Sequence, residues 1–138
     1  MTRFRTLFAA LLVALSVAVV ATPSARAEDP APLFVNLTTD DAWAAGMAVT
    51  FTRMAMSQGH EAAIWLNSQA VALADTARKS PVHPASGKTL REMLEGFIAE
   101  GGTLIVCPMC STIAGVDPDD LIKEIGRASC RERVYTKV

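Results

Sequence analysis

The feature that most constrains the fold of this chain is a series of three short apolar runs, separated by segments with a different pattern. The runs are LFVNL (33–37), EAAIWLN (61–67) and TLIVC (103–107). They are apolar at nearly every position, which is typical of strands in a parallel sheet that is covered on both faces. Because helical patterns separate the runs, the sequence predicts an α/β domain: a small layered structure with a mostly parallel central sheet flanked by helices.

The first helical pattern follows the first apolar run and ends at Gly59. Its large apolar residues Trp43, Met47, Phe51 and Met54 recur at the spacing of an α-helix. We expect this face of the helix to belong to the hydrophobic core.

A later helix is marked more clearly, at both of its ends. Thr89 and Glu92 form the pattern of a capping box, which begins a helix. Two glycines, at 101 and 102, follow the segment and end it. Between these signals, one helix face is apolar through Leu90, Met93, Leu94, Phe97 and Ile98.

Two further helices are predicted from composition. An alanine-rich helix is expected at 68–78, and the loop KSPVHPASGK at 79–88 follows it because prolines and glycine interrupt any regular pattern. Asp117 and Pro118 have the order of an N-cap and a first helical residue, so they predict a last helix through Ile125. A final strand is expected after that helix.

The first 27 residues have the pattern of a secretory signal peptide. Arg3 and Arg5 form a basic start, residues 7–21 are apolar, and Ala25-Arg26-Ala27 is a small-x-small signal for cleavage after Ala27. The apolar stretch is shorter than the ~18 to 20 residues that a membrane-spanning helix needs. We therefore expect a periplasmic protein that has no membrane segment after cleavage.

The last segment, RASCRERVYTKV at 127–138, differs from the rest of the chain because it is basic and has no apolar period. We interpret it as a non-native read-through tail that replaces the final strand of the sheet. Residues 28–126 then form one domain with 6 lysines and arginines against 13 aspartates and glutamates, a net charge of −7. Such an acidic domain has no electrostatic basis for binding nucleic acid.

Polar and thiol side chains follow each of the three apolar runs. The carboxyl ends of parallel strands meet at one edge of the sheet, where open α/β sheets bind ligands and carry out chemistry. Cys110 lies beyond Pro108, in the first turn of a short helix, where backbone N–H groups and the helix dipole favour the nucleophilic thiolate. The candidate site residues are Cys107 and Cys110, with Asn36, Thr38, Asn67, Ser111 and Thr112 in support.

The CPMC pair at 107–110 is open to several interpretations. A zinc site would need four ligands, and beyond the pair the domain offers only His60 and His83, so we expect no metal and no cofactor. A structural disulfide would close a loop too short to stabilise the fold much. A thioredoxin-like oxidoreductase places its pair early in the chain and ahead of a long helix, whereas this pair is late.

The order of the motifs resembles the DsrE-like (DsrE/DsrF-like) family over residues 33–125. The resemblance rests on VNLTTDD after the first strand, on EGGTLIVCPMC and on GVDPDDLI. It implies a parallel α/β domain that assembles as a homo- or hetero-oligomer, such as a trimer or a hexamer. It also implies that Cys110 matches the cysteine that carries sulfane sulfur as a persulfide in sulfur-relay members. Cys107 corresponds to a cysteine that only some members have.

The resemblance therefore predicts an exported, sulfurtransferase-type sulfur carrier that meets a sulfur-donor or thiol-reductase protein. Cys107 would release sulfide from a persulfide on Cys110, or protect Cys110 between turnovers. The alternative is a non-enzymatic oligomeric domain in which the two cysteines form a structural or redox-sensing disulfide.

Overall fold

The computed structural model describes residues 30–127. The signal peptide predicted at 1–27 and nearly all of the segment predicted as a tail at 127–138 lie outside the described residues. The described chain forms a four-stranded parallel sheet in the order β1-β2-β3-β4. The strands are β1 (Leu33–Leu37), β2 (Ala62–Leu66), β3 (Thr103–Val106) and β4 (Gly126–Arg127). The predicted α/β class and its parallel sheet are confirmed.

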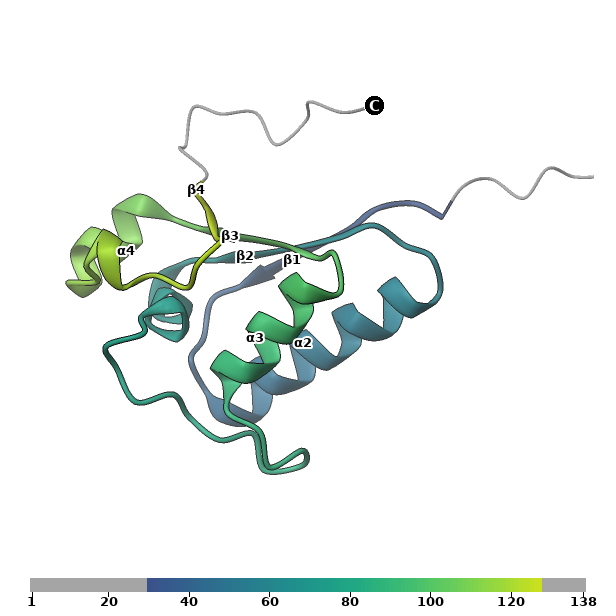
Figure 1. Cartoon of the computed structure of the whole chain (residues 1–138), viewed down its shortest axis with the longest axis horizontal. Helices are drawn as coiled ribbons and strands as arrows, with labels where there is room; N and C mark the ends of the chain where they lie inside the picture. Colours follow the sequence, from purple (N-terminus) through teal and green to yellow (C-terminus); the bar gives the residue numbers. More distant parts are fainter. Residues whose placement is uncertain (1–29, 128–138) are drawn as a thin grey trace, which may run out of the picture.

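The two long helices, α2 (Ala42–Ser57) and α3 (Leu90–Ala99), lie side by side on one face of the sheet (Figure 1). The strands follow one another across the sheet in sequence order, and crossover connections between parallel strands are right-handed. Successive crossovers in one direction therefore place their helices on the same face. We expected helices on both faces of the sheet. The two long helices instead lie on the same face, because strand order, and not strand composition, decides which face a helix covers.

Burial alternates along the strands as this arrangement requires. Val35, Ile64 and Leu104 are aligned across three strands; Ile64 and Leu104 are buried in the core, and Val35 packs against it. The side chains on the other face are less covered: Phe34 is exposed, and Trp65 is partly buried. The core lies between the sheet and the two helices.

Helix α3 has both the capping box and the buried apolar face that the sequence predicts. The Thr89 side chain accepts from the Glu92 backbone N–H, and the Glu92 carboxylate accepts from the Thr89 N–H at 2.7 Å. The predicted capping box is therefore present. Four of the five predicted apolar positions are buried and Ile98 packs against the core; the buried four are Leu90, Met93, Leu94 and Phe97.

Helix α2 is the main correction to the sequence analysis. Its large apolar residues Trp43, Met47, Phe51 and Met54 are exposed rather than part of the core. The buried face consists of smaller side chains, namely Ala45, Gly46, Val49 and Thr52. The physical reason is close packing: a Cβ atom at Gly46 would lie 2.3 Å from Cδ2 of His83, so a large side chain has no room on this face.

The alanine-rich segment predicted as an α-helix at 68–78 is the 3₁₀-helix η2 (Ser68–Ala74). Its buried residues form two pairs three apart, which fit the three-residue period of a 3₁₀-helix. The buried pairs are Ala70 with Leu73 and Val71 with Ala74.

The last predicted helix is only one turn, η3 (Pro118–Asp120). The Asp117 cap is present, because its carboxylate accepts from the Asp119 N–H at 2.9 Å. The helix does not continue to Ile125, since Leu121 is extended and pairs with Asp75 while the Ile122 N–H donates to the Ala74 carbonyl.

The last two described residues form part of the expected final strand. Gly126 and Arg127 form β4, in which Gly126 aligns with Ile105 and Arg127 with Val106. The strand that we expected to be lost is therefore present for two residues. Within 30–127, none of the helices has the length and apolar character to cross a membrane.

Candidate functional site

The carboxyl edge of the sheet brings several of the predicted residues together. The ladder continues one residue past the strands, because the Asn67 N–H donates to the Leu37 carbonyl at 3.0 Å and the Cys107 N–H donates to the Leu66 carbonyl at 2.9 Å. Asn67 and Cys107 therefore follow adjacent strands in one row, and the exposed Thr38 follows β1. The predicted convergence of strand ends is present.

Cys107 is held in the structure at this edge. It is the N-cap of helix α4 (Pro108–Ala114), and only 6% of its surface is exposed. Its carbonyl accepts from the Ser111 N–H and from the Ser111 hydroxyl, both at 3.0 Å. Its thiol is free, so the two cysteines of the pair are not joined to each other.

Cys110 is the third residue of α4 and lies in its first turn, as predicted. It is partly exposed, and its buried part packs against the edge of the hydrophobic core. Residues three apart at the start of a helix share one side of it, so Cys107 and Cys110 are neighbours. The pair therefore consists of one buried and one accessible cysteine.

The two asparagines at the sheet edge bind each other. The Asn67 Nδ2 donates to the Asn36 Oδ1, and the Ser68 hydroxyl donates to the Asn67 Oδ1 at 3.2 Å. Ser68 has a positive φ of 51°, which is uncommon for a residue other than glycine. The polar pair thus links the ends of β1 and β2, and Asn67 is the member in the row beside Cys107.

The Ser111 and Thr112 hydroxyls bond to backbone carbonyls, whereas we expected these two residues to support the cysteines. The buried Ser111 hydroxyl donates to the Cys107 carbonyl, and the Thr112 hydroxyl donates to the Pro108 carbonyl, each at 3.0 Å. A hydroxyl has one hydrogen to donate. Either group must give up its bond to the helix backbone before it can donate to a sulfur atom on Cys110.

The far end of α4 is fixed by a network that the sequence analysis missed. The Arg78 guanidinium donates to the Ala114 carbonyl at 2.6 Å and pairs with the Asp75 carboxylate at 2.7 Å. Asp75 is buried, and its carbonyl accepts from the Arg91 guanidinium at 2.6 Å. The Asp-x-x-Arg spacing at 75–78 is the sequence signal that could have indicated the ion pair in this network. This network holds the cysteine-bearing helix against η2, which packs beside it.

The two histidines lie away from the cysteine helix in the fold. His60 precedes β2, at the opposite edge of the sheet, and its Nδ1 is 2.7 Å from the Ala31 carbonyl. His83 packs against Trp43 of α2, with ring centroids 5.8 Å apart. Within residues 30–127, no three His, Cys, Asp or Glu side chains come together in an arrangement that could hold a metal ion.

His83 is a second feature that the sequence did not indicate. We interpreted it as a loop residue, and it does lie in the loop, but it is almost fully buried. Its Nδ1 is 3.1 Å from the Ser86 hydroxyl, while its Nε2 has no hydrogen-bond partner among the described residues. His83 therefore anchors the 79–88 loop to the small-residue face of α2.

Comparison with known proteins agrees with the fold. Residues 33–132 match the DsrE/DsrF-like family. Among solved structures, the ychN protein from E. coli is similar, with a TM-score of 0.58 and 17% identity over 74% of this chain and 86% of that one. The protein of unknown function MTH1491 from Methanobacterium thermoautotrophicum has a TM-score of 0.57 and 14% identity over 73% of this chain and 83% of that one. No protein with a curated function matches the chain.

Proposed function

We propose that this chain, which belongs to the DsrE/DsrF-like family, is a sulfur-relay protein in which Cys110 carries sulfane sulfur as a persulfide. Members of the family are generally linked to sulfur relay. The proposal assigns the reacting sulfur to one residue of the chain, and the other cysteine of the pair to its release.

The observation that carries the assignment is the difference in exposure between the two cysteines. A carrier thiol must reach the surface to meet a donor, and Cys110 is partly exposed whereas Cys107 is 6% exposed. Cys107 is also the N-cap of α4, so moving it would disturb the start of the helix. Cys110 can react from its place within the first turn.

The transfer proceeds by thiol–sulfur exchange. The Cys110 thiolate attacks a terminal sulfur atom of a polysulfide, the adjacent S–S bond breaks, and a polysulfide shorter by one sulfur leaves. Attack by the Cys107 thiolate on the inner sulfur of the Cys110 persulfide would release hydrosulfide and leave a Cys107–Cys110 disulfide. A thiol reductant must then reopen that disulfide before the next cycle.

The partners and the compartment follow from this chemistry and from the first 27 residues. We propose export to the periplasm, where an oxidising environment favours closure of the pair. A sulfur-donor protein and a thiol-reductase protein would then act on the same exposed cysteine. Cell fractionation after expression of the full chain in a bacterial host tests export: the processed protein should appear in the periplasmic fraction.

The proposed chemistry can be tested by intact mass spectrometry of the exported protein. The protein is fully reduced, freed of reductant and exposed to polysulfide, in parallel with the variants Cys110→Ser and Cys107→Ser. We expect one sulfur atom to be added to the wild type and to Cys107→Ser, and none to Cys110→Ser. The adduct should last longer in Cys107→Ser, since this variant has lost the thiol that releases sulfide.

The same experiment distinguishes the alternative function. If Cys107→Ser, which has lost the resolving thiol, gains no sulfur while the wild type only loses two hydrogens, the pair forms a disulfide without a persulfide and the carrier proposal is wrong. Sulfur addition to Cys110→Ser at the wild-type level would also contradict the assignment, because Cys107 or the tail cysteine would then be the acceptor.

A further inference from the structure

Helix α4, which contains Cys110, has only seven residues. A helix of this length is not stable by itself in water, so contacts with the rest of the chain must hold it in place. At its start, the Cys107 N–H is bound to the Leu66 carbonyl in the sheet. The position of Cys110 relative to Cys107 therefore depends on what holds the other end of α4.

The other end of α4 is bound by the side chain of Arg78. Its Nη2 donates to the Ala114 carbonyl at 2.6 Å, and a cation at the last turn of a helix also interacts favourably with the helix dipole. Ala114 and Cys110 are four residues apart, so they lie one turn apart on the same side of α4, and both pack against the edge of the core. The contact of Arg78 is therefore one helical turn from the proposed sulfur acceptor.

Arg78 is itself fixed by the buried turn at 75–78. Its Nε is 2.7 Å from the Asp75 carboxylate, which is 5% exposed and also accepts from the Ala77 N–H at 3.0 Å. Arg91 of α3 holds the same turn, because its Nη2 donates to the Asp75 and Arg78 carbonyls at 2.6 and 2.5 Å. Moving the Arg78 guanidinium would leave a buried carboxylate without its cation, which is unfavourable. Helix α3 thus fixes, through this turn, the last turn of α4.

The two thiols can react with each other only if they lie close together. The Cβ atoms of residues three apart on a helix are about 5 to 6 Å apart, and a disulfide needs about 3.5 to 4.5 Å. Cys107 and Cys110 are therefore near the separation of a disulfide. An ordered α4 keeps them there, whereas a frayed α4 would let Cys110 move away and lower the effective concentration of one thiol at the other.

We propose that Arg78 is a positioning residue: by holding the last turn of α4, it keeps Cys110 close enough to Cys107 for the two thiols to react with each other. Its role in turnover rests on the proposed release of sulfide by Cys107, whereas its effect on the two thiols does not. Loading of Cys110 needs only access from the surface, and Cys110 is partly exposed. Loss of the Arg78 contact should therefore slow release of sulfide and leave loading unchanged.

The equilibrium between the dithiol and the disulfide tests this inference. In a glutathione buffer, glutathione disulfide oxidises the pair to the Cys107–Cys110 disulfide and is itself reduced to two molecules of glutathione. Every protein carries Cys130→Ser, so that only this pair can close. Acid quenching, alkylation and intact mass spectrometry give the oxidised fraction. We expect Arg78→Gln to lower the equilibrium constant for disulfide formation roughly fivefold, because a charged hydrogen bond at a helix end is lost.

Arg78→Lys separates the charge of the side chain from its geometry. Lysine retains the cation but not the two separate donors that reach Asp75 and Ala114. We expect this variant to restore part of the loss, with an equilibrium constant roughly twofold below the wild type.

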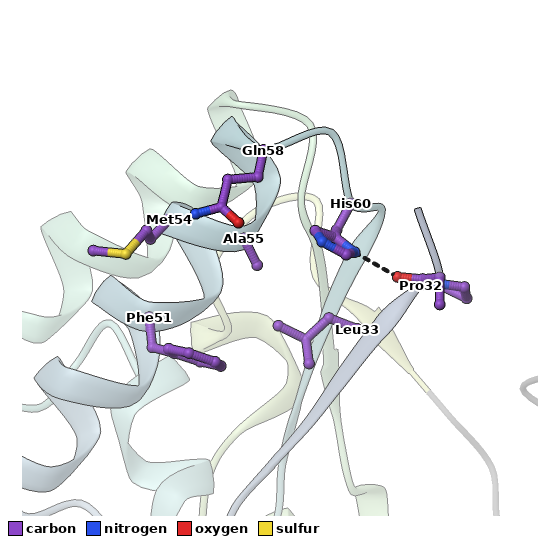
Figure 2. Close-up of a pocket in the computed structure, with 8 residues that line it drawn as sticks. Pro32, Leu33, Phe51, Met54, Ala55, Gln58 and His60 are labelled. Atoms are coloured by element: carbon purple, nitrogen blue, oxygen red, sulfur yellow. Dashed lines mark hydrogen bonds between the residues drawn. The ribbon is translucent and has the colours of Figure 1, made fainter. Parts of the chain in front are cut away.

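Arg53→Gln is the matched control. The Arg53 Nε donates to the Glu100 carboxylate at 2.8 Å, so this variant also removes an arginine–carboxylate pair. Arg53 lies on α2 between Phe51 and Met54, which line an open groove at the edge of the sheet opposite to the cysteines (Figure 2). We expect the disulfide equilibrium to be unchanged in Arg53→Gln, because distant sites act independently.

Alkylation of the reduced, native proteins shows whether the fold is intact, since Cys107 is 6% exposed and should stay protected in each variant. An unchanged or higher equilibrium constant in a folded Arg78→Gln would overturn the inference, and so would an equal fall in Arg53→Gln. If Cys107 becomes reactive in Arg78→Gln, an unchanged constant in Arg78→Lys overturns it instead. A wild type that never gains sulfur would refute the sulfur-carrier proposal alone, because the glutathione equilibrium involves no persulfide.

Discussion

Helices α2 and α3 lie side by side on one face of the sheet but use opposite kinds of residue to pack there. In α3 the large apolar residues are buried, and acidic side chains such as Glu92 and Glu95 are exposed. In α2 the small residues are buried and the large apolar ones are exposed. A periodic apolar stripe therefore shows that a helix has two faces, but the space available in the core decides which face is buried.

The largest difference between the two helices should appear on removal of an aromatic ring. Phe97→Ala in α3 removes a fully buried ring and should lower the free energy of unfolding by about 3 to 5 kcal/mol. Phe51→Ala in α2 should change it by less than about 0.5 kcal/mol within one chain, because Phe51 is mostly exposed. Urea denaturation of both variants, at a protein concentration too low for association, measures this difference. Equal losses of unfolding free energy would mean that the face of α2 that contains Phe51 is buried, as the sequence predicted.

A second comparison uses one glycine from each helix. Gly46→Ala should lower the free energy of unfolding by about 1 to 3 kcal/mol, because the new Cβ would collide with the buried His83 ring. Gly96→Ala should raise it by about 0.5 to 1 kcal/mol, since its Cβ would meet only the Arg53 guanidinium at 3.9 Å and alanine favours a helix. Thermal melts of both variants test the signs. A Gly46→Ala variant more stable than the wild type would show that the His83 ring does not occupy the space beside Gly46.

The caps of the two helices provide a smaller test. Thr89→Ala removes the side-chain acceptor of the α3 capping box, and Asp41→Ala removes the carboxylate that accepts from Trp43 N–H and Ala44 N–H at the start of α2. Each should cost about 0.5 to 2 kcal/mol of unfolding free energy. Urea denaturation that found no loss for Thr89→Ala would contradict the cap that both the sequence and the structure assign to α3.

The smallest expected effect is a dependence on pH. Hydrogen bonds from Thr89 lower the pKa of Glu92 below its ordinary value. A carboxyl whose pKa is lower in the folded state stabilises the fold above its unfolded pKa, and that stabilisation is lost as the pH falls through the folded pKa. Glu92→Gln should therefore flatten the fall in melting temperature between about pH 5 and pH 3. Glu95→Gln removes a carboxylate from the same helix without touching the cap, and it should flatten that fall less.

The same contrast shows what could be predicted from sequence. The strands, the α3 cap and the Asp117 cap depend on neighbouring residues, and local patterns specified them correctly. Burial of α2 depends on the fit of Gly46 to His83, a residue in a distant loop, and no local pattern contains that fit. The ends of η2 and η3 likewise depend on the pairing of Asp75 with Leu121 across the fold.

The candidate site was predictable to a similar degree. The position of Cys110 in the first turn after β3 followed from Pro108 and from the apolar run before it. The hydroxyl bonds of Ser111 and Thr112 did not, because these residues can donate to the helix backbone as easily as to a neighbouring sulfur. The Asp75–Arg78 ion pair has a signal in the i,i+3 spacing, but the contacts of Arg78 with Ala114 and of Arg91 with Asp75 were missed because their acceptors are backbone carbonyls, which carry no sequence signal.

The most direct test of the sulfur-carrier proposal is to locate the added sulfur in the wild-type protein. After brief exposure of the reduced protein to limiting polysulfide, alkylation and fragment-ion mass spectrometry of the peptide that contains both cysteines assign each modification. The account predicts an alkylated persulfide on Cys110 and an alkylated thiol, without added sulfur, on Cys107. A persulfide found first on Cys107, or a Cys107–Cys110 disulfide with no persulfide at any time, would contradict it.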